Sequence, residues 1–278
     1  MLEVSIALTA GIAVGLALGL TGSGGSLFAI PLLIYVIGLD MASAVPISLF
    51  VVGITALVGA FSAFNKKLLL LRPTIIFGMA GILSAPLGLK LGAMTPENYR
   101  ILGFAVLAIF MAARMGWQSF NEQSSKIVRA DLAQEDPSGV CRYSPDGKMG
   151  FTLPCAMALI VAGSITGTMS GFFGVGGGFL IVPALMFVIR LDMSHAVGSS
   201  LAIIAMIGIS GGAFNGFPIL IGNMSALSFG IGSLVGMFLG RVLANKFAGP
   251  LLQKIFTVAL FSTGIIMLVQ YFGGENVF

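Results

Sequence analysis

The chain has 278 residues, of which 57% are hydrophobic and only 9% are charged, and its mean hydropathy is +1.06. A soluble domain carries about 25% charged residues, so this composition excludes a soluble globular protein and indicates an integral membrane protein. The net charge of +4 does not indicate a nucleic-acid partner, because the positive-inside rule accounts for basic residues in short loops. The two cysteines, Cys141 and Cys155, have no metal-ligand spacing, and a disulfide framework is not indicated.

The first half of the chain contains five apolar segments, which cover residues 4–20, 26–38, 43–64, 72–91 and 99–117. The first has no basic n-region before it, so we expect a retained span and not a signal peptide. The second reaches only about 20 Å as a helix, less than the roughly 30 Å hydrocarbon core. We therefore expect it to be a half-helix or one arm of a re-entrant hairpin.

The second half repeats this pattern, with apolar segments over residues 153–171, 178–189, 195–214, 224–243 and 253–272. Matching residues are separated by a constant offset of 152, so that Gly174 corresponds to Gly22 and Asp192 to Asp40. An offset this regular indicates a duplication. The sequence therefore predicts three units: a first transmembrane repeat over residues 1–117, a cytoplasmic linker over residues 118–150 and a second transmembrane repeat over residues 151–278.

The basic residues predict how the two halves are oriented. If each half crosses the membrane an odd number of times and the linker is cytoplasmic, 12 of the 14 Lys and Arg residues lie inside and 2 outside. Four crossings in each half would give 8 and 6. The first arrangement predicts an all-α polytopic membrane protein with two inverted-topology repeats and with both termini outside the cytoplasm. Its short second helices would meet near the midplane, as in secondary transporters.

Each half contains a glycine-rich stretch before its short second helix, and we call these the first glycine loop (residues 22–26) and the second glycine loop (residues 174–178). Free N–H groups at a helix start, together with a glycine backbone, form a concave site for an anion. Helix packing or a re-entrant turn is the alternative use of these glycines. The residues expected to bind a substrate are Thr21, Gly22, Ser23, Gly24, Gly25, Ser26, Ser48, Gly174, Val175, Gly176, Gly177, Gly178, Ser199 and Ser200.

Four further polar residues stand at the ends of the third segments. Asp40 and Asp192 each precede a helix start and are expected to be N-caps, with proton coupling as the alternative. Asn65 and Asn215 are expected to be C-caps, with substrate contact as the alternative. The sequence contains no nucleotide-binding, haem or hydrolase motif, so neither a cofactor nor a metal is expected, and the chain is not expected to be an enzyme.

The duplicated pattern Gly-x-Gly-Gly followed by an apolar run and proline, at residues 22–31 and 174–183, resembles the sulfite exporter TauE/SafE family, also called the toluene sulfonate uptake permease family. The chain departs from that family at Ser26, where a third glycine is usual, and at Asn65 and Asn215, where many relatives are expected to have histidine. The resemblance implies a transporter of sulfite, sulfonates or related sulfur anions in the bacterial inner membrane.

Together, the residues and the resemblance predict a secondary transporter, and specifically an exporter, that works by alternating access about a central anion site. The expected partners are the small anion and the lipid bilayer, and a homo-oligomer is left open. The alternative is an intramembrane structural or assembly subunit that transports nothing and whose glycines serve helix packing.

Overall fold

The computed structural model describes residues 2–22, 24–120, 142–143, 149–150, 153–189, 193–213, 216–247, 257–258 and 261–269. The helices of the first half are α1 (Leu2–Thr21), the 3-10 helix η1 (Gly24–Phe28), α2 (Ala29–Tyr35), α3 (Met41–Asn65), α4 (Leu71–Met94) and α5 (Glu97–Phe120). Those of the second half are α7 (Leu153–Phe173), α8 (Gly178–Ile189), α9 (Met193–Gly212), α10 (Gly216–Gly222) and α11 (Met224–Phe247).

Within the described residues, six helices are long and apolar enough to cross a membrane: α1, α3, α4, α7, α9 and α11. This confirms the predicted helical membrane class. The segments expected to be short are short, since α2 has 7 residues and α8 has 12. The helix α10 was not expected, and two short strands, β1 (Arg142–Tyr143) and β2 (Met149–Gly150), pair antiparallel in the predicted linker.

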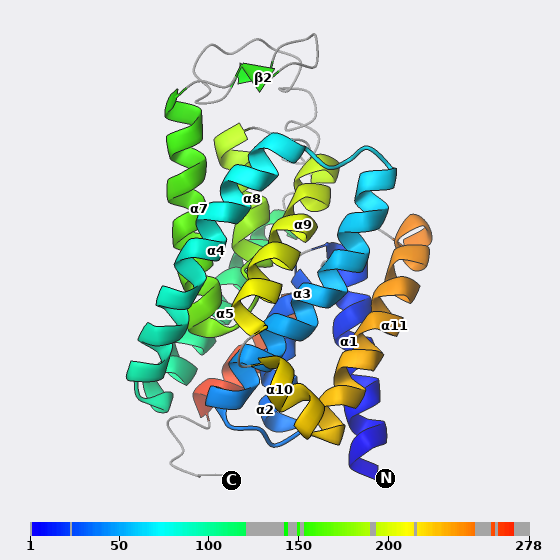
Figure 1. Cartoon of the computed structure of the whole chain (residues 1–278). Helices are drawn as coiled ribbons and strands as arrows, with labels where there is room; N and C mark the ends of the chain where they lie inside the picture. The colour runs from blue at the N-terminus through cyan, green and yellow to red at the C-terminus, as the bar shows by residue number, and fades with distance from the viewer. Residues whose placement is uncertain are drawn as a thin grey trace.

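Equivalent helices of the two halves run in opposite directions (Figure 1). In that view α1, α3 and α11 run upward, whereas α7, α9 and α4 run downward. The offset of 152 pairs α1 with α7, α3 with α9 and α4 with α11. Each of these six helices therefore has an antiparallel counterpart in the other half.

The first helix of each half packs on a long helix of the other half, α1 on α11 and α7 on α4. An added Cβ at Gly19 of α1 would lie 2.7 Å from the carbonyl oxygen of Met237 in α11, and one at Gly163 of α7 would lie 2.5 Å from that of Phe77 in α4. Glycine allows two helix backbones to approach this closely. Three contacts between α1 and α11 have counterparts between α7 and α4, in which both residues are shifted by 152. Gly11 on Phe229 corresponds to Gly163 on Phe77, Gly15 on Ser233 to Gly167 on Gly81, and Gly19 on Met237 to Gly171 on Ala85.

Helices α3 and α9 form the centre of the bundle. Of their apolar windows, 78% and 67% respectively are buried, against 39% for each of the other four spans. They cross where Gly53 meets Gly208, whose Cα would lie 3.1 Å from a Cβ at Gly53. The outer helices expose large apolar side chains such as Leu83 and Phe238, as expected for a surface that faces lipid.

Candidate functional site

Both glycine loops begin with the same turn. The N–H of Gly22 donates to the carbonyl oxygen of Leu18, and that of Gly174 to the carbonyl oxygen of Ser170, each at 2.7 Å. Both glycines have a φ of 73°, in the left-handed region, which glycine enters at little cost and which ends many helices. The turns therefore end α1 and α7 and redirect the chain into the short second helices.

Each loop then packs against the third helix of the other half. Gly22 contacts the side chain of Val197 in α9, and a Cβ at Gly174 would lie 2.8 Å from the Cα of Val45 in α3. Val45 and Val197 are themselves 152 residues apart. The hydroxyl of Ser48, also in α3, donates to the carbonyl oxygens of Val45 and Gly174. Ser48 thus fastens the second glycine loop to α3.

The two loops meet each other between α3 and α9. A Cβ at Gly176 would lie 3.1 Å from Val52 of α3, 3.4 Å from Ile204 of α9 and 3.9 Å from the Cβ of Ser26 in the first loop. Ser26 is fully buried. The structure therefore brings together Ser26 and the second-loop residues, which were predicted to share one site.

After the first turn the loops differ. The first continues into η1, whereas the second keeps Gly176 and Gly177 at φ of 68° and 67° before α8 begins. Val175 is 1% exposed and both glycines are buried. In the described part of the chain, the N–H groups of Val175, Gly176 and Gly177 meet no acceptor. Buried N–H groups are almost always paired, so this loop offers unused donors at the centre of the protein.

The other predicted hydroxyls serve the backbone. Thr21 Oγ1 donates to the carbonyl oxygen four residues earlier at 2.8 Å, and Ser200 Oγ to the one three residues earlier at 2.9 Å. Ser199 Oγ accepts the N–H of Leu70 at 3.2 Å and caps the start of α4. Ser23 lies outside the described residues.

Of the two expected caps that the structure describes, Asp40 is confirmed in position only, and Asn65 is wrong. Asp40 occupies the N-cap position of α3, but its side chain makes no capping hydrogen bond. Instead Glu97 of α5 accepts the N–H of Met41 at 3.0 Å. Asn65 is the last residue of α3, and the C-cap is Lys66. The counterparts Asp192 and Asn215 lie outside the described residues.

Sequence reasoning missed three buried groups. Among the described residues, Thr74 Oγ1, Arg100 Nε and Ser170 Oγ are buried without a hydrogen-bond partner. Ser170 lies on α7 just before the second loop, at the position equivalent to Leu18. The available signal was the difference between the two equivalent positions, where the first half has a leucine and the second half a serine. Cys155 is disulfide-bonded, contrary to expectation; Cys141 lies outside the described residues.

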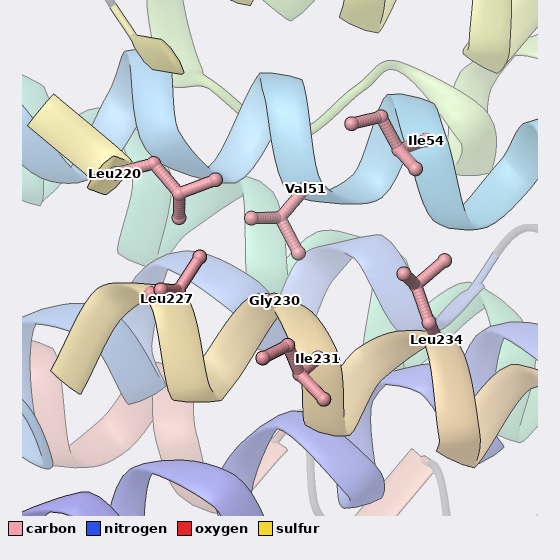
Figure 2. A pocket seen from close by; sticks show the side chains of 7 residues that line it. All are labelled: Val51, Ile54, Leu220, Leu227, Gly230, Ile231 and Leu234. Carbon is pink, nitrogen blue, oxygen red and sulfur yellow. The ribbon is translucent and has the colours of Figure 1, made fainter. Parts of the chain in front are cut away.

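A separate apolar groove of about 100 Å³ lies between α3, α10 and α11 (Figure 2). Its lining consists of Val51, Ile54, Leu220, Leu227, Gly230, Ile231 and Leu234. These side chains carry no hydrogen-bond donor, so the groove does not suit an anion. In the described residues, no group of three or more His, Cys, Asp or Glu side chains is placed to hold a metal ion.

The sequence profile of the family described as "Sulfite exporter TauE/SafE" matches residues 7–267. A "Probable membrane transporter protein" of Xylella fastidiosa is 30% identical over 92% of this chain and 91% of its own length. The "Probable membrane transporter protein YdhB" of Bacillus subtilis is 23% identical over 91% of this chain and 96% of its own. No solved structure matches. The chain is thus a multi-pass membrane protein of the sulfite exporter TauE/SafE family, a family of transporters and not of enzymes.

Proposed function

We propose that the protein exports a small sulfur oxyanion, such as sulfite or an organosulfonate, across the bacterial inner membrane. The observation that carries the proposal is the set of buried, unused N–H groups at Val175, Gly176 and Gly177, where the two glycine loops meet. Donors of this kind suit an anion, since they need no rearrangement to receive it. The side chains nearest Gly176 come from Val52, Ile204 and Ser26, so backbone dipoles and hydroxyls would hold the anion.

The arrangement of the helices supports alternating access. Equivalent helices run in opposite directions, and each loop contacts the third helix of the opposite half. These features are typical of inverted repeats that rock about a central site. The site is closed here, since Ser26 and Val175 are buried. Rocking would open it to one side at a time.

The membrane potential would supply a driving force for export. It contributes about 2.3 kcal/mol per elementary charge per 100 mV, and an inside-negative potential drives an anion outward. The description of the family specifies sulfite, whereas the relatives are described only as probable membrane transporters. The family name is therefore what favours sulfite among small oxyanions.

Flux measurements in proteoliposomes test the proposal. We expect saturable sulfite movement with the wild-type protein and none with Gly176→Val, because valine would occupy the space between Val52 and Ile204 and would not tolerate a positive φ. The control is Gly222→Val, since an added Cβ there meets nothing within 4 Å. If the wild-type protein moves none of sulfite, sulfonates or related oxyanions, the chain is instead a structural or assembly subunit.

A further inference from the structure

Ser170 and Thr74 are the described helical residues whose buried hydroxyls have no hydrogen-bond partner, and of the two Ser170 lies directly before a glycine loop. Serine and threonine in a helix normally donate to a carbonyl oxygen three or four residues earlier. Thr55, Thr166 and Ser200 do so at 2.7, 2.8 and 2.9 Å. Ser170 Oγ has no partner, although the residue is only 1% exposed. A buried hydroxyl left in this state is destabilising, so a role outside the helix would explain it.

Ser170 lies beside the second glycine loop. Its carbonyl oxygen accepts the N–H of Gly174 at 2.7 Å, which closes the first turn of the loop. Its Cβ lies 3.3 Å from the point where a Cβ on Gly177 would stand. The side chain therefore faces the same residue whose N–H has no acceptor.

The offset between the halves reveals an exchange of hydroxyl and apolar positions. Ser170 corresponds to Leu18, and Ser26 corresponds to Gly178. At these positions the first half carries Ser26 in its loop and Leu18 on the preceding helix, whereas the second half carries Gly178 in its loop and Ser170 on the preceding helix. Ser26 approaches Gly176, with its Cβ 3.9 Å from an added Cβ there, while Ser170 approaches Gly177. The side chains of Ser26 and Ser170 consequently both approach the second loop.

We propose that Ser170 is a substrate-binding residue, and that the anion sits asymmetrically on the second glycine loop between the hydroxyls of Ser170 and Ser26. This inference rests on the proposed function. One oxygen of an oxyanion accepts from the N–H groups of Gly176 and Gly177, and its other oxygens accept from the two hydroxyls. The apolar walls formed by Val52 and Ile204 exclude water and strengthen these bonds.

The experiment compares Ser170→Ala with Ser164→Ala in purified full-length protein. Ser164 lies on the same helix, half-buried, six residues earlier and therefore on a different face. Thermal unfolding is followed over a range of sulfite concentrations, since a ligand that binds only the folded state raises the unfolding temperature. The flux of sulfite into proteoliposomes is measured in parallel.

We expect Ser170→Ala to be at least as stable as wild type without sulfite, because no hydrogen bond is lost. Its sulfite response should shift to about two- to tenfold higher concentration, as for the loss of one neutral hydrogen bond. Ser164→Ala should respond like wild type. This combination of unchanged stability and weaker binding is not what a structural hydroxyl would give.

Two results overturn the inference. If Ser170→Ala responds to sulfite at wild-type concentrations, the hydroxyl does not contact the anion. If it is less stable than wild type without sulfite, the hydroxyl has a structural role. A wild-type protein that neither binds nor moves sulfite, sulfonates or related oxyanions would instead overturn the proposed function and this inference with it.

Discussion

The close packing of α1 on α11 predicts a difference between two alanine substitutions in one helix. Gly240 and Gly230 both lie within α11, so alanine improves helix propensity by about 1 kcal/mol at each. A Cβ at Gly240 would lie 2.6 Å from the carbonyl oxygen of Leu16, whereas the nearest atom to one at Gly230 is Val51 Cγ2 at 3.5 Å. Only Gly240→Ala therefore creates a clash.

The size of that clash follows from the same distances. Ordinary contact begins at 3.4 Å, so a Cβ at Gly240 is short by 3.4 − 2.6, or 0.8 Å. The obstructing atom belongs to a helix backbone, so α1 and α11 must move apart. Overpacking of this kind costs about 1–3 kcal/mol. At about 2–4 °C per kcal/mol, Gly240→Ala should unfold about 2–12 °C below Gly230→Ala.

Thermal unfolding in detergent, followed by circular dichroism, measures this difference. Gly19→Ala provides a check from the other helix, because its Cβ would lie 2.7 Å from the carbonyl oxygen of Met237. It should behave like Gly240→Ala. If Gly240→Ala and Gly230→Ala unfold at the same temperature, α1 and α11 do not pack through their glycine faces. The packing of the first helix of one half on a helix of the other half would then be wrong.

Two further predictions concern the ends of the bundle. Glu97→Ala should lower the free energy of unfolding by about 1 kcal/mol, since it removes the acceptor of the Met41 N–H; Glu97→Gln keeps an acceptor and should lose less, and equal losses in urea titrations would contradict the cap. In a variant whose two native cysteines are replaced, an impermeant thiol reagent applied to intact cells should label Asn98→Cys and spare Ser138→Cys. Labelling of Ser138→Cys would place the linker outside the cytoplasm, in an oxidising compartment where disulfides such as that of Cys155 persist.

The sequence predicted the repeat well because the duplication preserved glycines at a fixed offset, and the same offset relates their contacts. It did not predict which helices pack on each other, since a repeat shows which helices are equivalent and not which are in contact. The N-cap was assigned to Asp40 from its neighbours, but the acceptor is Glu97, which lies far along the chain. Ser170 was missed because a serine in an apolar helix usually bonds its own backbone. Its burial and missing partner, together with its place directly before the second glycine loop, distinguish it.

The pairing of α1 with α11 has a consequence for how the protein is made. About 200 residues separate the end of α1 from the start of α11. At about 5–20 residues per second, α1 waits roughly 10–40 s in the membrane before its partner is synthesised. Throughout that interval the backbone around Gly11, Gly15 and Gly19 lacks the α11 backbone on which it packs. The first half therefore cannot complete its packing until α11 has been inserted, after most of the second half has been made.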